Sequence, residues 1–127
     1  MGLLKSLVIV GIGGFIGTVL RFLTSLYFQA NSMSHFPWAT FTVNIAGSFL
    51  IGLFYGISEK GNLMPSDVRL FLTVGLCGGF TTFSSISNDA FIMLQGREWM
   101  RFSLYTTMSF LFGLIAIYMG RTLIKLF

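Results

Sequence analysis

The sequence predicts an all-α integral membrane protein with four spanning helices. Three observations support this fold class: 54% of the 127 residues are hydrophobic, only 9% are charged, and four long apolar runs alternate with short polar segments. A soluble domain of this size carries roughly 25% charged residues and cannot bury so much apolar surface. The chain therefore belongs in a lipid bilayer, with almost no mass left for a soluble domain.

Each apolar run can form one helix, because about 20 mainly apolar residues cross the hydrocarbon core of a bilayer. The approximate spans are 3–28, 38–57, 69–94 and 102–126, and together they form one membrane domain, 1–127. The segments between them are ANSMSHFP, SEKGNLMPSD and QGREWMR. The first run lacks a small-x-small cleavage pattern, so we expect a permanent span rather than a signal peptide.

The few charged residues exclude several function classes. Eight Lys and Arg residues against four acids give a net charge of +4, which in so apolar a chain indicates loop anchors rather than a nucleic-acid surface. The single cysteine, Cys77, excludes an intrachain disulfide. No nucleophile–base arrangement points to an enzyme.

The basic residues are divided almost evenly between the two sides of the predicted bundle. Five lie on the side of the N-terminus, the second loop and the C-terminus, and three lie on the other side. Orientation in the membrane follows this difference. A ratio so close to even is compatible with insertion in both orientations. It is equally compatible with a count too small to determine orientation.

Small residues recur in the first two spans, where they let helices approach closely. Four helices leave little room for a lined pathway inside one copy, so an oligomer is the simplest functional form. The small residues are Gly11, Gly14, Gly17 and Thr18 in the first span and Gly47, Ser48, Gly52 and Gly56 in the second.

Polar residues within the spans each admit two interpretations. Asn44 either bonds a neighbouring helix or offers its two uncharged N–H donors to an anion, and Thr40 shares its helical face. Arg21 either snorkels to water or attracts anions.

Asp89 is the only acid within the third region, and it could pair with a nearby arginine or with a helix end. Tyr105 and Ser109, spaced i, i+4 on one face of the fourth span, suit helix packing and a pore lining about equally; Ser103 and Thr106 fall elsewhere on that helix.

The stretch CGGFTTFSSIS places two glycines and five hydroxyl side chains in the middle of the third region. Each glycine lowers helix stability by about 1 kcal/mol relative to alanine, and Ser and Thr hydroxyls compete for backbone hydrogen bonds. We therefore expect a broken third helix near the bilayer centre. A break frees carbonyls for a small cation and presents a helix N-terminus to an anion. A kink bridged by neighbouring helices is the structural alternative.

Three stretches, GLCGGFTTFSSIS, WATFTVNIAGSFLIG and GGFIGTVLRF, together resemble the Fluc (CrcB) family of fluoride channels over nearly the whole chain. The resemblance implies an antiparallel, dual-topology homodimer in the bacterial inner membrane. Such a dimer exports fluoride passively through two pores and confers fluoride resistance. It also implies a structural Na⁺ at the dimer centre, held by the backbone carbonyls of Gly78 and Thr81 from each subunit.

The resemblance also assigns residue roles. Asn44 matches the pore asparagine, and Phe83 matches the first of two phenylalanines whose positive ring edges face fluoride. Arg21 resembles the vestibule arginine, and Asp89 replaces an acid that is usually glutamate. The implied fluoride pathway comprises Asn44, Phe83, Ile86, Tyr105 and Ser109, with Thr82 and Ser85 as additional donors and Thr40 and Asp89 as structural residues.

Two departures from the family pattern concern this pathway. The usual TTFSTFS reads TTFSSIS here, so Ile86 replaces the second phenylalanine and offers no quadrupolar ring edge. Gly113 and Ile117 stand where some relatives have hydroxyls.

Two other functions fit a small four-span chain. A small multidrug exporter needs a membrane-embedded carboxylate, but the first span has none and Asp89 lies near the end of its span. A non-transporting scaffold subunit predicts ordinary packing of Asn44 and no ion flux.

Overall fold

The computed structural model describes residues 2–31, 36–61 and 63–126, and every regular element in these ranges is helical. Three spanning regions are single helices: α1 (Leu3–Asn31), α2 (Trp38–Glu59) and α6 (Trp99–Lys125). The third region, Ser66–Gln95, is made of four segments. These are α3 (Ser66–Leu70), the π-helical η1 (Phe71–Cys77), α4 (Gly78–Phe80) and α5 (Phe83–Gln95).

Four helical regions of the described chain are long and apolar enough to cross a membrane, which confirms the all-α, four-span prediction. Their ends differ from the expected spans by up to three residues. The third region begins at Ser66 rather than at residue 69, and α6 begins at Trp99 rather than at residue 102. Helix α1 continues to Asn31, inside the segment expected to be a loop, and residues 32–35 of that segment lie outside the described residues.

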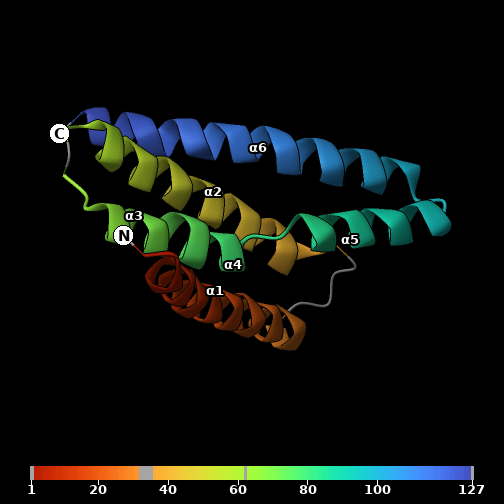
Figure 1. Ribbon diagram of the computed structural model, residues 1–127. Coiled ribbons are helices and arrows are strands. Elements are labelled where there is room, and N and C mark those ends of the chain that lie inside the picture. Colours follow the sequence, from red (N-terminus) through yellow and green to blue (C-terminus); the bar gives the residue numbers. More distant parts are fainter. Residues whose placement is uncertain (1, 32–35, 62, 127) are drawn as a thin grey trace.

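The helices are arranged around the third region. Helix α2 packs mainly against α6, whereas α1 packs mainly against η1 and α4. Figure 1 shows α1 and α6 on opposite sides of the third region, with both chain termini at one end of the bundle and the α5–α6 turn at the other. The even number of spans therefore brings the two termini to the same end.

Glycines let α1 and the third region approach to backbone contact. A Cβ atom on Gly13 would lie 2.7 Å from the Phe71 carbonyl oxygen and 3.0 Å from the Gly75 Cα atom. A Cβ atom on Gly79 would lie 2.6 Å from the Gly14 carbonyl oxygen. No larger side chain fits at either position unless the backbone moves, so this crossing depends on glycine.

The second glycine-dependent crossing joins α2 to α6. A Cβ atom on Gly52 would overlap the Ile117 carbonyl, and one on Gly56 would lie 3.2 Å from the Ile124 Cβ atom. Gly52 and Gly56, two of the small residues expected in α2, thus serve packing inside one chain. By contrast, Gly11 on α1 has no atom within 4 Å of its Cβ position.

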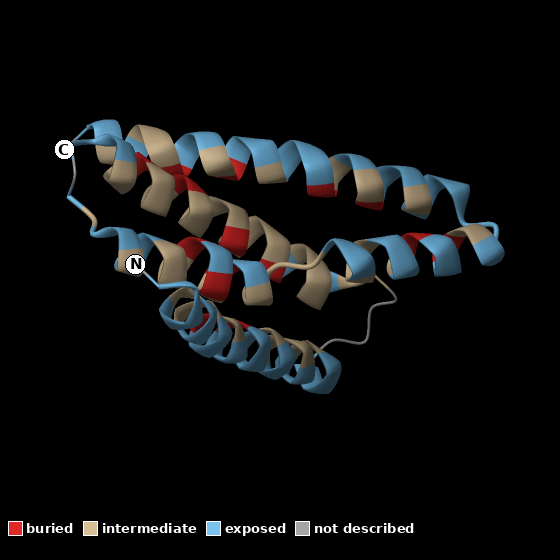
Figure 2. Cartoon of the chain, in the orientation of Figure 1, coloured by how far each residue is buried: buried red, intermediate tan, exposed pale blue. Residues whose placement is uncertain are grey.

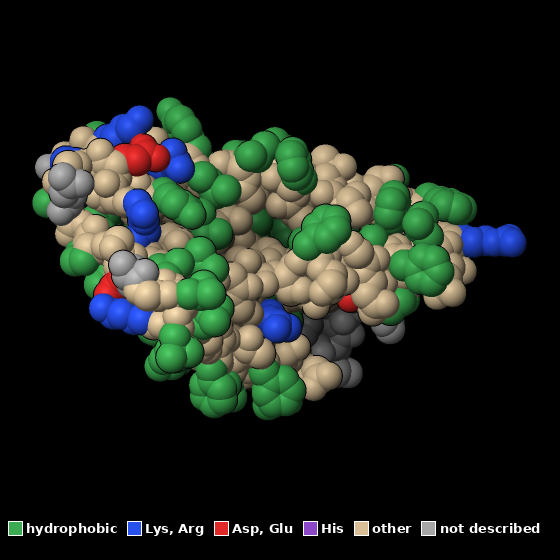
Figure 3. Space-filling model, in the orientation of Figure 1, with side chains coloured by type: hydrophobic (Ala, Val, Ile, Leu, Met, Phe, Trp, Pro, Cys, Tyr) green, Lys and Arg blue, Asp and Glu red, His purple; other side chains and the backbone are tan. Residues whose placement is uncertain are grey.

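The outer surface of the bundle is mostly apolar. Figure 2 shows that buried positions are confined to the inward faces of the helices. Large side chains such as Leu3, Phe15 and Phe110 are more than two-thirds exposed. Figure 3 shows hydrophobic side chains over much of the visible face and most charged ones at the end that carries the termini. Lipid is the medium that satisfies such a surface.

Candidate functional site

Two extended residues separate α4 from α5 in the third region. Thr81 has φ −88° and ψ 158°, and Thr82 has φ −154° and ψ 121°. The prediction of a break rested on the glycine pair and on the Thr and Ser hydroxyls together; Gly78 and Gly79 are themselves helical. The extended backbone begins after Phe80, at the two threonines.

We call Thr81–Thr82 the extended step. The Asn44 side chain of α2 supplies hydrogen-bond partners to its backbone. Its Nδ2 donates to the Thr82 carbonyl oxygen at 3.1 Å, and the Thr82 N–H donates to Asn44 Oδ1 at 2.8 Å. In a continuous α-helix the Thr82 N–H would instead donate to the Gly78 carbonyl. The Asn44 amide thus takes the place of a helical hydrogen bond, as polar groups must inside a membrane.

The threonine hydroxyls stabilise the two helix ends that meet here. Thr82 is the N-cap of α5, and its Oγ1 accepts from the Ser85 N–H at 3.2 Å. Thr82 Oγ1 also lies 3.2 Å from the hydroxyl oxygens of Ser84 and Ser85. Thr81 Oγ1 donates to the Cys77 carbonyl at 2.8 Å. The Thr82 hydroxyl therefore caps α5, whereas the Thr81 hydroxyl adds a second donor to a carbonyl that already accepts from the Thr81 N–H.

Arg21 points into the bundle rather than along α1 to its end. Its Nε donates to the Gly79 carbonyl oxygen at 3.0 Å. Arg21 and Thr82 also line a crevice of about 50 Å³, together with Ser25, Ala39, Thr40, Val43 and Ser85. This bond ties the Arg21 side chain to α4, and the choice between snorkelling and anion attraction stays a prediction.

A partly buried hydrogen-bonded cluster joins α2, α5 and α6. The fully buried Tyr105 donates its hydroxyl to Asp89 Oδ2 at 3.0 Å. The Thr40 hydroxyl interacts with both of these side chains. The Phe36 ring packs edge-on against Tyr105, with centroids 5.3 Å apart and planes at 87°. The Tyr105 hydroxyl is thus committed to Asp89.

A groove of about 560 Å³ lies beside the extended step, and residues of α2, α5 and α6 line it. It contains five of the residues that were expected on the fluoride pathway and lacks two, Tyr105 and Ser85. None of its described lining residues is charged. The lining is Asn44, Ser48, Thr81, Thr82, Phe83, Ile86, Ser87, Ala90, Thr106, Ser109, Phe110, Gly113, Leu114 and Ile117.

Within the described part of the chain, two groove residues carry groups that make no contact that would prevent them from binding a ligand: the Ser109 hydroxyl and the Phe83 ring. Ser109 is 8% exposed, and its buried hydroxyl has no hydrogen-bond partner among the described residues. The Phe83 ring is 82% exposed. Ser109 thus offers a spare donor to the groove, and Phe83 an open ring.

Eight residues that line the groove were not predicted as site residues, among them Ser48, Thr106 and Phe110. Ser48 follows Asn44 at i+4, so helical spacing could have placed it beside that amide. It was read only as a small packing residue. Thr106 was placed elsewhere on its helix, and its hydroxyl donates to the Phe102 carbonyl at 2.9 Å. Nothing in the sequence pointed to Phe110 as a site residue, because aromatic residues are common in membrane spans.

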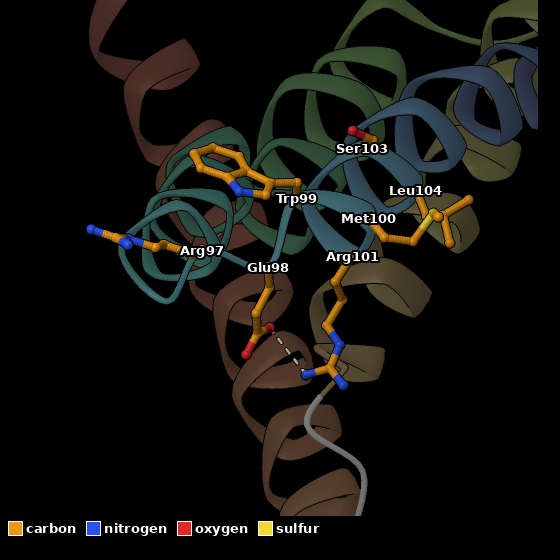
Figure 4. Close-up of a pocket in the computed structure, with 7 residues that line it drawn as sticks. All are labelled: Arg97, Glu98, Trp99, Met100, Arg101, Ser103 and Leu104. Carbon is orange, nitrogen blue, oxygen red and sulfur yellow. Dashed lines mark hydrogen bonds and ion pairs between the residues drawn. The ribbon is translucent and has the colours of Figure 1, made fainter.

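A second hollow lies at the α5–α6 turn, and α5 separates it along the chain from the extended step (Figure 4). In Figure 4 Glu98 and Arg101 face each other, paired at 3.1 Å, while Arg97 points the other way. This hollow shares no lining residue with the groove. It contains no residue that was predicted for the site.

Side chains offer no metal centre in the part of the chain that the structure describes. No group of three His, Cys, Asp or Glu residues there could hold an ion. A cation at the extended step would therefore rely on backbone oxygens. Those of Gly78 and Thr81 remain the predicted ligands.

Comparison with known proteins identifies the family. The family model described as "CrcB-like protein, Camphor Resistance (CrcB)" matches residues 8–121. The chain is 46% identical over 120 residues to the fluoride-specific ion channel FluC of Bacteroides fragilis, covering 92% of this chain and 94% of that protein. It is 42% identical over 122 residues to the FluC of Flavobacterium psychrophilum, covering 96% and 98%. This chain is therefore a member of the CrcB family.

Proposed function

We propose that this protein is a fluoride-selective channel that lets fluoride leave the cytoplasm passively and so protects the cell from fluoride toxicity. The names of the similar proteins support fluoride as the ion. The observation that carries the proposal is the groove, where the unpartnered Ser109 hydroxyl and the open Phe83 ring lie beside the Asn44 amide.

The chemistry of this lining suits a small, strongly hydrated anion. An ion that crosses a membrane needs ligands that replace its water but release it again. Hydroxyl and amide donors and the positive edge of an aromatic ring are such weak ligands. Asn44 uses one Nδ2 hydrogen on Thr82, so a second hydrogen remains for the anion. A cationic side chain would hold fluoride more firmly, and the groove has none among its described residues.

The remaining predicted residues position this lining. Asp89 and Thr40 hold Tyr105, so Tyr105 acts on the pathway through its packing between α2, α5 and α6. Ser85 takes part in the cap of α5. Arg21 places a positive charge beside α4, where it favours entry of anions toward the extended step.

The groove argues for a channel over a multidrug exporter. An exporter of organic cations needs a carboxylate that binds protons and substrate in turn. The acid of α5, Asp89, is bonded to Tyr105 and does not line the groove. A scaffold subunit, in turn, would have no use for the spare donor of Ser109.

The functional form that we propose is an antiparallel homodimer with two pores, inserted in the bacterial inner membrane. In a single chain the groove is open on one side and Phe83 is 82% exposed. A second copy would cover this ring and close the wall. The five-to-three division of basic residues is compatible with insertion in both orientations.

A sodium ion at the dimer centre fits the backbone at the extended step. The Thr82 N–H is bonded to Asn44, so the Gly78 carbonyl lacks the donor that a continuous helix would give it. Carbonyl oxygens suit hard cations. The Gly78 and Thr81 carbonyls of each subunit would hold the ion, which supplies positive charge where the two third regions meet.

Growth in fluoride tests the proposal in cells. A bacterial strain without its own fluoride exporter is transformed with this chain and grown in medium that contains fluoride. We expect growth that the empty vector does not support. A chain that is present in the membrane but gives no protection would contradict the proposed function.

A further inference from the structure

Phe110 is the aromatic residue that α6 contributes to the groove. The α6 residues that line the groove follow one helical stripe, which runs through Thr106, Phe110, Gly113 and Ile117. Among the described lining residues from α6, Phe110 is the only aromatic one. It directly follows Ser109, whose hydroxyl is the spare donor of the groove. A ring and a free donor thus stand at adjacent positions on the same wall.

The Phe110 ring is not engaged by other aromatic side chains. Two other aromatic residues of α6 are paired: Tyr105 packs edge-on against Phe36, and Phe112 against Phe41 at a centroid distance of 6.2 Å. Phe110 takes part in no aromatic pair among the described residues, and it is 72% exposed. Its ring edge is therefore open for a ligand of the groove.

The opposite wall, formed by α5, carries one ring, that of Phe83, and an aliphatic side chain at position 86. Ile86 of α5 lines the same groove, and its aliphatic side chain has no quadrupole. Phe83 is the only other aromatic lining residue in the described chain. With Phe83 alone, this chain would offer an anion in the groove a single ring edge.

We propose that Phe110 supplies the second aromatic ring edge of the fluoride pathway and compensates for isoleucine at position 86. This inference rests on the proposed function and extends it, because it assigns a specificity role to a residue of α6. The ring edge carries partial positive charge, so it stabilises fluoride without trapping it. Residues 86 and 110 then act as alternative sources of one contact.

The test compares fluoride efflux from liposomes that contain purified wild-type protein, Phe110→Leu, Ile86→Phe or the double variant. Phe110→Leu should slow efflux about fivefold, the change expected when a contact of the strength of one aromatic edge is lost from the barrier. Phe15→Leu on α1 is the matched control, since Phe15 is also 72% exposed and does not line the groove. It should leave the rate unchanged.

The double variant is the decisive arm. If positions 86 and 110 are interchangeable sources of a ring edge, Phe110→Leu should cost much less in the Ile86→Phe background than in the wild type. An equal loss in both backgrounds, or wild-type efflux from Phe110→Leu, would overturn the inference. Phe110→Tyr keeps a ring edge and should retain efflux, which separates this role from a general packing defect. Wild-type protein that releases no fluoride would instead refute the proposed function and this inference with it.

Discussion

Asn44 and Thr82 are joined by two hydrogen bonds in opposite directions, one from the Asn44 amide to the Thr82 carbonyl and one from the Thr82 N–H to the Asn44 Oδ1. A single side chain of α2 thus satisfies both backbone groups of a residue that is extended between two helical segments. This contact ties the most irregular part of the third region to a regular helix and places the amide in the wall of the groove.

Asn44→Ala should both destabilise the protein and reduce fluoride flux. It leaves the partly buried N–H and carbonyl of Thr82 without partners, which costs about 2 kcal/mol. The free energy of unfolding in detergent, measured from thermal or denaturant melting, should fall by that order. Asn31→Ala is the control, because within the described residues Asn31 donates to the Tyr27 carbonyl on the exposed end of its own helix. Equal melting of the two variants would contradict the role of Asn44.

Phe83→Ile should reduce fluoride efflux sharply, in a chain that already has Ile86. The substitution keeps an apolar side chain of similar bulk but removes the ring edge from the α5 wall of the groove. Efflux from liposomes measures the effect, after gel filtration has shown that the variant is folded. Phe91→Ile is the matched control on the same helix, since Phe91 is exposed and does not line the groove. Near-normal flux through Phe83→Ile would remove the ring-edge argument.

Gly17→Ala and Gly11→Ala should have opposite effects on stability, although both add one methyl group to α1. At Gly17 the methyl group would overlap the Leu76 carbonyl and lie 2.8 Å from the Phe80 nitrogen, so about 2 kcal/mol of stability should be lost. At Gly11 no atom lies within 4 Å, and alanine is the better helix former by about 1 kcal/mol.

Melting of both variants in one detergent gives the comparison. If a second subunit packs on Gly11, the gain there should appear only under conditions that separate the subunits. Tolerance of Gly17→Ala would contradict the close crossing of α1 and the third region.

Arg97→Gly should stabilise the turn between α5 and α6. Arg97 has φ 57°, a left-handed conformation that favours glycine. The Glu98 N–H donates to the Met93 carbonyl and the Arg97 N–H to the Leu94 carbonyl, the two bonds of a Schellman motif. Glycine at this position should therefore raise stability by about 1 kcal/mol. Arg97→Ala removes the same charge but keeps the strain, so it should give no such gain; equal stabilisation by both variants would show that charge, not backbone conformation, is responsible.

The sequence was sufficient to predict the four spans, because their apolar runs and the polar segments between them are unambiguous. It was also sufficient to place Thr40 and Asn44 on one face of α2, and Tyr105 and Ser109 on one face of α6. Both pairs face the interior of the bundle. Helical periodicity fixes such relationships within one helix without any knowledge of its neighbours.

Contacts between helices could not be predicted in the same way. The pairing of Asp89 with Tyr105 and of Arg21 with the Gly79 carbonyl depends on the rotation and register of α1, α5 and α6 against one another. The extended step lies inside the stretch where a break was predicted, but the sequence could not show which residues of that stretch are extended, for a related reason. Glycine lowers the intrinsic stability of a helix, but Gly79 is held in helical form where it packs closely on Gly14. The backbone is extended instead at Thr82, where Asn44 supplies the missing hydrogen bonds.

The most direct test of the account is fluoride release from liposomes that contain only this purified protein. The vesicles are loaded with potassium fluoride, a potassium ionophore is added, and external fluoride is followed with an electrode, with chloride-loaded vesicles in parallel. A fluoride-selective channel should release fluoride rapidly and only when the ionophore is present, while chloride is retained. Folded, dimeric protein that releases no fluoride, or releases chloride equally fast, would contradict it.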